Sequence, residues 1–256
     1  MSLIKPDLLL FVGDISEGDI KLIKKINSIE IPTYIILGNH DRGKDKTGYK
    51  LEKQIRILKE KYCGWDLKVF NNKINILGAR PCSAGGGYFL SREVLGLYGP
   101  LTEEESVKKI IRCSQSSRKE LPLLLLAHSG PTGLGSDASS ICGKDWKEPA
   151  LDWGDRDLYR AIKNIQDNRN VDIVIFGHMH NKLKRNQGMR QMFVRDSKGT
   201  CYLNAAVVPR YKKSDEGELI INFSWVVFKD KKLKYVSQRW YGNLGQIVKE
   251  EVFYNS

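Results

Sequence analysis

The nine residues TYIILGNHD, numbered 33–41, join an apolar run to a glycine and then to three polar side chains, Asn39, His40 and Asp41. β-Branched and aromatic residues favour a strand, and the glycine permits a tight turn where the strand ends. Ligands of open α/β sheets bind beyond the carboxyl ends of the strands. This stretch therefore predicts a strand whose end carries candidate functional residues.

An apolar run that ends in a polar side chain occurs at three more places. These are LLLFV (8–12) before Asp14, LLLL (123–126) before His128, and IVIF (173–176) before His178 and His180. The runs do not alternate, which is typical of strands buried on both faces. All four histidines of the chain belong to these motifs. Imidazole beside carboxylate or amide oxygen suits Zn, Mn, Fe or Ni, so the pattern predicts a metal site.

The rest of the sequence predicts an α/β protein in which strands and helices alternate over the first two-thirds. Apolar spacing and end signals predict helices at 19–28, 51–61, 102–116 and 156–166. Strands are predicted at 7–12, 33–37, 74–78, 121–127 and 171–176, and further strands joined by turns at 191–194, 200–205, 218–228 and 233–241. Thr102 is expected to cap its helix in a capping box with Glu105.

The composition is that of a globular protein, with 41% hydrophobic and 28% charged residues in 256. No apolar run approaches the ~18 residues of a membrane span, and the first six residues lack a signal-peptide pattern. No membrane partner is expected. The five cysteines contain no CxxC pair. We expect buried or half-buried thiols in a reducing, cytoplasmic compartment.

The net charge of +12 is compatible with a polyanionic partner such as nucleic acid. The basic residues are dispersed, however. Their densest groups are 182–185, 210–213 and 229–234. A solvated surface is therefore favoured, and a nucleic-acid surface is the alternative.

The ordered motifs Gly-Asp (13–14), Gly-Asn-His-Asp (38–41), His (128) and Gly-His-x-His (177–180) resemble the calcineurin-like metallophosphoesterase superfamily. The resemblance spans residues 7–180. It implies a four-layer αββα sandwich of two mixed sheets that forms a single domain over residues 1–256. It also implies a hydrolase that cleaves a phosphomonoester or phosphodiester by attack of a metal-bound hydroxide. The cofactors implied are divalent ions, namely Mn, Fe or Zn.

The resemblance also implies roles for the metal ligands. Asp14 would bridge two metal ions. Asn39, His128 and His178 would bind the second ion. His180 would bind the first.

The substrate side of the site follows from the same resemblance. His40 would stand beside the phosphate as the catalytic acid, and Asp41 would orient its ring. Asn39 and His40 would both contact the substrate. Asp41 as a simple cap or turn residue remains an alternative, and Arg42 is either a phosphate clamp or an exposed loop arginine.

Three glycine-containing segments look like a cyanobacterial and plastid branch of the superfamily. They are RPCSAGGG (80–87) and the pair SGPTGLG (129–135) and ICGKDW (141–146). They are expected to be either substrate-lining loops or plain surface loops. This likeness makes the plastid stroma an alternative location.

One motif of the superfamily, Asp-x-His on the strand before Gly-Asp, is absent from this sequence. Only twelve residues precede Gly13, and they contain no histidine. Asp7, the one acid among them, lies ~23 Å of extended chain before Asp14. We therefore expect one intact metal site and one incomplete site. Without the strand that carries this motif, the neighbouring strand of the sheet would have an unpaired, unprotected edge. We therefore expect that the native protein extends upstream of Met1. The alternative is a degenerate family member that lacks the motif.

Three functions follow from these patterns. The leading one is a metal-dependent phosphoesterase with a phosphate-ester substrate. A nuclease is the variant that makes most use of the positive charge. A catalytically impaired phosphate- or nucleotide-binding module is the alternative outside enzymes, motivated by the absent ligands.

Overall fold

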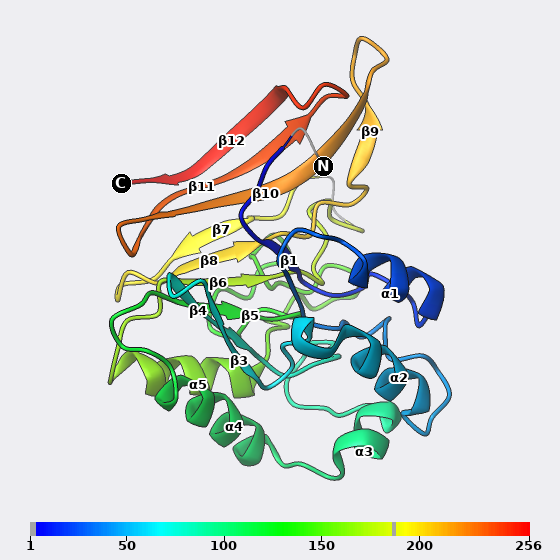
Figure 1. Ribbon diagram of the computed structural model, residues 1–256, viewed down its shortest axis with the longest axis vertical. Helices are drawn as coiled ribbons and strands as arrows, with labels where there is room; N and C mark the ends of the chain where they lie inside the picture. The colour runs from blue at the N-terminus through cyan, green and yellow to red at the C-terminus, as the bar shows by residue number, and fades with distance from the viewer. Residues whose placement is uncertain (1–3, 186–187) are drawn as a thin grey trace.

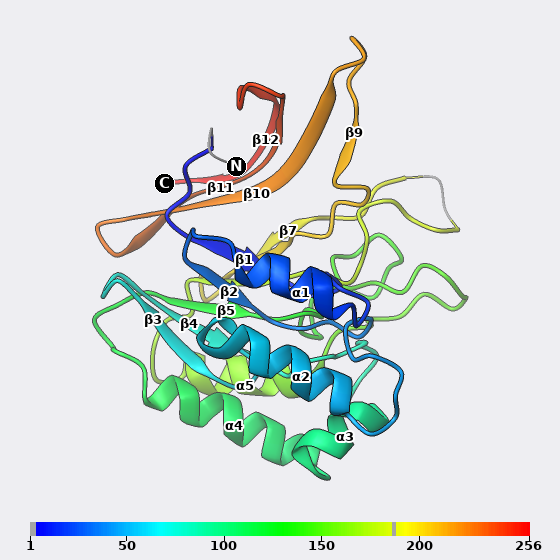
Figure 2. The same ribbon diagram turned by 45° about the vertical axis from the view of Figure 1, so that its right-hand side comes forward.

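The computed structural model describes residues 4–185 and 188–256, which form a mixed α/β structure (Figure 1). The first sheet is a parallel pair, β1 (Leu9–Phe11) and β2 (Thr33–Ile35). Helices α1 (Ile20–Asn27) and α2 (Tyr49–Leu58) pack against each other on this side of the molecule (Figure 2). A short 3-10 turn, Lys59–Lys61, follows α2. This part of the fold brings the ends of β1 and β2 side by side.

The second sheet is mixed and has the strand order β3-β4-β5-β6-β8-β7. Its strands are β3 (Leu67–Phe70), β4 (Ile74–Gly78), β5 (Leu123–Leu126), β6 (Ile173–Phe176), β7 (Phe193–Arg195) and β8 (Cys201–Asn204). The central strands β4, β5, β6 and β8 run parallel, and β3 and β7 are antiparallel edges. Both apolar runs that precede the later histidines form adjacent central strands, β5 and β6, and are fully buried.

Helices α4 (Glu103–Gln115) and α5 (Arg156–Gln166) pack against each other beneath this sheet, and α3 (Arg92–Tyr98) lies beside α2 (Figures 1 and 2). The predicted capping box is confirmed, because Thr102 Oγ1 accepts from Glu105 N and the Glu105 carboxylate accepts from Thr102 N. The mixed sheet thus lies above the α4–α5 pair, and α1 and α2 lie to its side, next to β1 and β2 (Figure 1).

The third sheet is antiparallel, with the order β12-β11-β10-β9. Its strands are β9 (Tyr211–Lys213), β10 (Leu219–Lys229), β11 (Lys232–Tyr241) and β12 (Ile247–Asn255). The turn expected between residues 228 and 233 is present, and it joins the antiparallel strands β10 and β11. Two mixed sheets were expected. In the described residues the strands instead form three sheets, namely one parallel pair, one mixed sheet and one antiparallel sheet.

The cysteines are free thiols, four of them buried and Cys113 half-buried, as expected. Burial raises the pKa of the Cys63 thiol to about 12 and that of the Cys201 thiol to about 11. These thiols therefore carry no thiolate character near neutral pH. Within the described ranges, no helix has both the length and the apolar character needed to cross a membrane.

Candidate metal centre

The carboxyl ends of β1, β2, β5 and β6 meet at one place and carry Asp14, Asn39, His128 and His178 there. Two glycines make this approach possible. A Cβ at Gly13 would lie 2.5 Å from His128 Nδ1 and 2.6 Å from the Gly38 nitrogen. A Cβ at Gly38 would collide with the Asp14 carboxylate. The strand ends can meet only because neither residue has a side chain.

His128 lies at the centre of the cluster and is buried, with 1% of its surface exposed. Its Nδ1 lies 2.6 Å from the Val12 carbonyl oxygen, and an oxygen there can only accept. Nδ1 is therefore the protonated nitrogen. The other nitrogen, Nε2, is directed at Asn39 Oδ1, 2.9 Å away, and at Asp14 Oδ1, 3.4 Å away.

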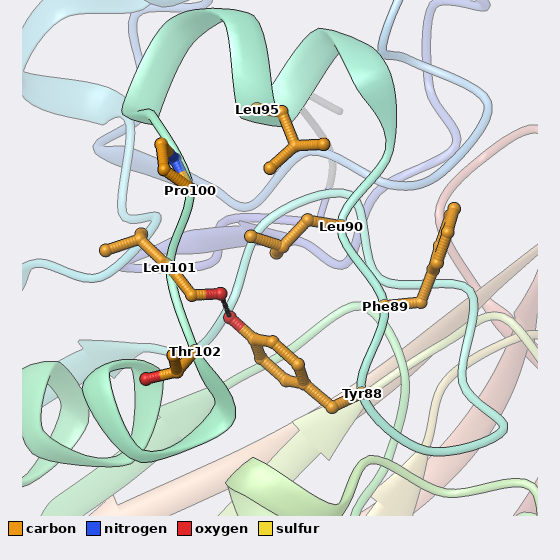
Figure 3. A pocket seen from close by; sticks show the side chains of 7 residues that line it. All are labelled: Tyr88, Phe89, Leu90, Leu95, Pro100, Leu101 and Thr102. Carbon is orange, nitrogen blue, oxygen red and sulfur yellow. Dashed lines mark hydrogen bonds between the residues drawn. The ribbon is translucent and has the colours of Figure 1, made fainter.

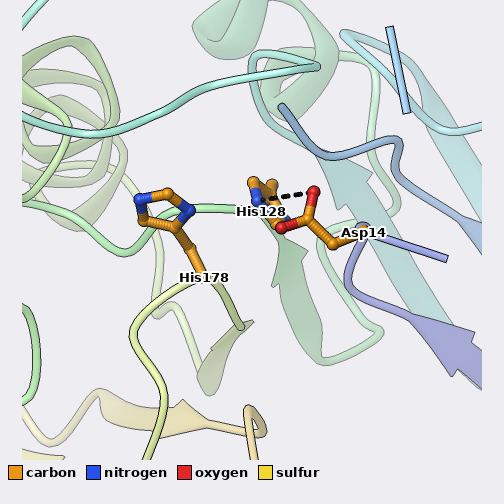
Figure 4. A group of neighbouring side chains, drawn as sticks. All are labelled: Asp14, His128 and His178. Atoms are coloured by element: carbon orange, nitrogen blue, oxygen red, sulfur yellow. Dashed lines mark ion pairs between the residues drawn. The ribbon is translucent and has the colours of Figure 1, made fainter. Parts of the chain in front are cut away.

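Asp14, His128 and His178 can bind one ion together, because their ligand atoms all lie within 4.8 Å of one another. Figure 4 shows the Asp14 carboxylate turned toward the His128 ring, with the His178 ring beside them. Asp14 (φ 54°) and His178 (φ 66°) both adopt the left-handed backbone conformation. This conformation is unfavourable for residues with a side chain and is typical of functional sites.

The chemistry of this donor set fits a divalent cation. In the neutral His128 tautomer, the lone pair of Nε2 faces two oxygens that carry lone pairs of their own. A divalent cation between these atoms removes that repulsion. Imidazole nitrogen, carboxylate oxygen and amide oxygen are all ligands of first-row divalent metals.

The pKa shifts in the cluster follow from the same geometry. Burial favours a neutral carboxyl, but the His128 ring and the His40 N–H hold the pKa of Asp14 well below its usual range. Burial also disfavours a charged His128, yet the Asp14 carboxylate and the Val12 carbonyl raise the pKa of His128. Burial, together with repulsion from the His128 ring whenever that ring is protonated, lowers the pKa of His178 to about 3. Asp14 is thus anionic and His178 neutral near pH 7, as metal ligands must be.

A pH-dependent loss of stability follows for the metal-free protein. The folded pKa of His178, about 3, lies below the unfolded value of ~6.5. The contribution of neutral His178 to the free energy of unfolding is therefore complete above pH 6.5, and it is lost as the pH falls from 6.5 toward 3. Between pH 7.5 and pH 5, the free energy of unfolding of chelated wild type should fall by about 2 kcal/mol more than that of His178→Asn. Urea titrations at the two pH values measure the difference, and equal losses would contradict it.

His180, the fifth predicted ligand, is exposed and lies outside the group of close ligand atoms. Burial of part of its ring and the nearby Lys184 lower its pKa, while Asp14 acts in the opposite direction. His180 is therefore near enough to Asp14 for their charges to interact. Its carbonyl oxygen accepts from Arg190 Nε at 3.0 Å.

The side chain of His40 is exposed beside the cluster, and its backbone N–H donates to Asp14 Oδ1 at 2.9 Å. Asp41 is fully buried and faces the loop after β1. Its Oδ1 accepts from the N–H groups of Ile15 and Ser16, and its Oδ2 accepts from that of Gly38. Asp41 thus links the loop that carries Asp14 to the turn that carries Asn39. Its hydrogen bonds within the described residues include none to the His40 ring.

Arg42 is half-buried, and its Nε lies 3.7 Å from the Glu93 carboxylate on α3. The guanidinium is therefore paired with an acid at the rim of the site. Its predicted contact with phosphate stays a prediction.

The sequence patterns missed a second set of residues, which hold the glycine-rich loops in place. Arg190 is 4% exposed and donates to the carbonyl oxygens of Ala138, Ser140 and Gly143. It thereby fixes the loop next to His180. No local pattern marks such an arginine, because its partners lie about 50 residues away in the sequence.

A separate apolar pocket lies between residues 88–90 and the segment from Leu95 to Thr102 (Figure 3). The Tyr88 hydroxyl donates to the Leu101 carbonyl oxygen at 2.8 Å across it. None of the predicted site residues lines this pocket. Its few polar groups make it unlike the metal cluster, and we assign it no part in the chemistry.

Comparison with known families agrees with this geometry. The family model for calcineurin-like phosphoesterases matches residues 2–182. The chain belongs to the calcineurin-like phosphoesterase family. The match contains all the strand-end motifs from Asp14 to His180. The expected superfamily is therefore confirmed.

A solved structure shows the same fold at low sequence identity. One crystal structure has a TM-score of 0.52 and 11% identity, covering 98% of this chain and 89% of the other. A second, from Thermus thermophilus, has a TM-score of 0.49 and 10% identity, covering 89% and 84% of the two chains. The first of these likenesses supports the fold alone. A comparison with curated proteins finds no match in sequence.

Proposed function

We propose that this calcineurin-like phosphoesterase hydrolyses a phosphomonoester or phosphodiester at the cluster of Asp14, Asn39, His128 and His178. The observation that carries the proposal is the convergence of these oxygen and nitrogen donors, with the exposed His40 next to them. A divalent cation bound there supplies positive charge to the phosphoryl oxygens and activates water at neutral pH. Manganese, iron and zinc all suit the ligands.

The residues around the metal position have distinct proposed tasks. Asn39 and His40 lie at the open side of the cluster and bind the phosphoryl group. His40 protonates the leaving oxygen as the general acid. Asp41 is a positioning residue, since its carboxylate holds the Asp14 loop against the Gly38 turn.

Removal of the proposed acid tests this assignment. His40→Ala should lower kcat for bis(p-nitrophenyl) phosphate with Mn²⁺ by a factor of ~10² to 10⁴, the usual contribution of a general acid. Its affinity for Mn²⁺ should stay close to that of wild type, because the hydrogen bond to Asp14 comes from the backbone. Steady-state kinetics and calorimetric Mn²⁺ titration measure both quantities. An unchanged kcat would reject His40 as the acid.

The two metal positions of the family are proposed to be unequal in this chain. One position has the four donors of the cluster, whereas the other has only Asp14 and His180 among the motif residues of this sequence. We expect calorimetric titration with Mn²⁺ to give one tight site and a second that binds at least ~10-fold more weakly, because affinity follows the number of ligands. Two comparably tight sites would contradict this prediction.

A nuclease is a second candidate, favoured by the basic residues that follow His180. Lys184 is close enough to contribute to the lowered pKa of His180. Hydrolysis of DNA or RNA that declines steeply with salt, without hydrolysis of small esters, would support this variant. Phosphate binding without turnover of any ester would instead support an impaired binding module.

A further inference from the structure

Gln54 is a fully buried polar residue on the apolar side of α2. The buried side chains of this helix are Leu51, Gln54 and Leu58, which recur at the spacing of a helix face that packs in a core. The exposed fraction of Gln54 is 0%, although glutamine is mostly found at protein surfaces. An apolar side chain in this place would avoid the cost of burying an amide. Core packing alone therefore does not account for Gln54.

The Gln54 amide contacts the loops of the metal centre at both of its ends. Its Nε2 donates to the Asp41 carbonyl oxygen at 2.6 Å and, at 3.3 Å, to the Lys50 carbonyl oxygen one turn earlier in α2. Because a carbonyl oxygen can only accept, these contacts fix the orientation of the amide. Its Oε1 faces Ser16 Oγ, which donates to it at 2.8 Å. Gln54 thus joins α2 both to the loop after β1 and to the turn after β2.

Ser16 continues this connection to the Asp41 carboxylate. Its single hydroxyl hydrogen is shared between Gln54 Oε1 and Asp41 Oδ1, and the second of these oxygens lies 2.9 Å from Ser16 Oγ. The N–H of Ser16 donates to the same Asp41 oxygen at 2.7 Å. All three side chains are buried, and hydrogen bonds are electrostatically stronger there than in water. Ser16, Asp41 and Gln54 therefore form one buried network, which we call the Gln54 network.

The Gln54 network is directly connected to two donors of the metal cluster. Asp14 lies two residues before Ser16, and Asn39 lies two residues before Asp41. Each of these donors directs an oxygen at His128 Nε2, with Asp14 Oδ1 3.4 Å away and Asn39 Oδ1 2.9 Å away. A shift of either loop would therefore change the separation of the two oxygens at the metal position.

We propose that Gln54 is a positioning residue of the metal centre. It acts through Ser16 and Asp41 and holds Asp14 and Asn39 at the separation that a divalent ion requires. The inference rests on the proposed function, because it assigns Gln54 a part in the same site. Groups that orient metal ligands without touching the ion typically contribute about 10- to 100-fold to metal affinity. Since Gln54 is fully buried, its effect is on the geometry of the ligands and not on the substrate.

Calorimetric titration of the protein with Mn²⁺, in the absence of substrate, tests this role. Gln54→Met keeps the length of the side chain but removes both of its hydrogen-bonding groups. We expect it to weaken Mn²⁺ binding by about tenfold or more. Ser16→Ala keeps the backbone N–H that donates to Asp41 and should weaken binding by a smaller factor. Because both residues act through one network, the loss in the double variant should be smaller than the product of the two single losses.

Gln166→Met is the matched control, since it removes a glutamine amide that also makes hydrogen bonds inside the fold. Gln166 Nε2 donates to Asp196 Oδ2 and to Thr200 Oγ1, both at 2.8 Å. Thr200 directly precedes β8, which runs parallel to β6, so it lies at the opposite edge of the sheet from His178. The Mn²⁺ affinity of this variant should stay within about twofold of wild type, as expected for an independent site. Urea denaturation measures the stability of each variant.

The comparison separates positioning from general stability. Equal losses of Mn²⁺ affinity in Gln54→Met and Gln166→Met would overturn the inference, as would Gln54→Met that binds Mn²⁺ like wild type. If Gln54→Met does not fold, Ser16→Ala decides the question. Weakened Mn²⁺ binding in folded Ser16→Ala would support the network, and unchanged binding would overturn it.

The ester assay keeps the two proposals distinguishable. Hydrolysis of bis(p-nitrophenyl) phosphate by wild type, together with unaltered Mn²⁺ affinity in Gln54→Met, would reject the positioning role and retain the proposed function. No hydrolysis by wild type with Mn²⁺, together with weakened Mn²⁺ binding in Gln54→Met but not in Gln166→Met, would reject the function and retain the positioning role.

Discussion

Asp14→Asn is expected to lower Mn²⁺-dependent hydrolysis of bis(p-nitrophenyl) phosphate by a factor of at least ~10³. The substitution keeps the size of the side chain but removes the charge that faces His128 Nε2 at 3.4 Å. Asn tolerates the left-handed conformation of this residue, so the fold should persist. Initial rates across a range of Mn²⁺ concentrations measure the effect.

Glu17→Gln is the matched control for Asp14→Asn. Glu17 is an exposed acid three residues away in the same loop, and its substitution removes the same charge. Its activity should stay within about twofold of wild type, as expected for a solvated charge. Equal losses in both variants would show that general electrostatics, rather than metal ligation, controls the rate.

Arg80→Met should lower the free energy of unfolding by about 3–5 kcal/mol, the usual result of removing one partner of a buried ion pair. Arg80 is 2% exposed. Its Nη2 lies 2.7 Å from Asp155 and its Nε 2.9 Å from Asp157. Methionine would leave two buried carboxylates without a cation. Burial already raises the pKa of Asp155, even though Arg80 opposes the shift.

Arg80 also fixes the glycine-rich loop that leads to the apolar pocket. Its Nη1 donates to the Phe89 carbonyl oxygen at 2.7 Å, and its guanidinium lies 4.9 Å from the Tyr88 ring centroid. Arg56→Met is the control, because Arg56 forms only an exposed pair with Glu52 and should change stability by less than ~0.5 kcal/mol. Urea denaturation compares the variants. A loss below about 1 kcal/mol for Arg80→Met would contradict this account of the loop.

The strand ends of the site could be predicted because each is a local pattern. An unbroken apolar run indicated a strand buried on both faces, and the residue after it was therefore expected at the sheet's carboxyl edge. The structure places β1, β2, β5 and β6 accordingly, and helix α5 begins and ends where its periodicity predicts. Asp14, Asn39, His128 and His178 come together because these four strand ends are neighbours.

Elements without a strong local pattern were missed. Helix α3 is only seven residues long and contains Gly96, which lowers helix propensity. Strand β9 is an edge strand of three exposed residues, and β12 is rich in charge and lies at the sheet's edge. Edge strands bury too few side chains to show alternation of apolar and polar residues.

The contacts that support the site could not be predicted at all. Arg80 meets Asp155 and Asp157 across more than 70 positions of sequence, and only the closed fold brings them together. The role of Asp41 shows the same limit. Its place beside His40 indicated an effect on that ring, whereas its carboxylate oxygens accept from backbone groups of Ile15, Ser16 and Gly38.

Anomalous diffraction from crystals soaked in Mn²⁺ tests the central claim most directly, since it locates the ion without reference to activity. We expect the strongest anomalous peak among Asp14, Asn39 Oδ1, His128 Nε2 and His178, with a weaker peak or none on the His180 side. A strongest peak outside this cluster, or no peak within it at Mn²⁺ concentrations that support hydrolysis, would contradict the assignment of the metal centre.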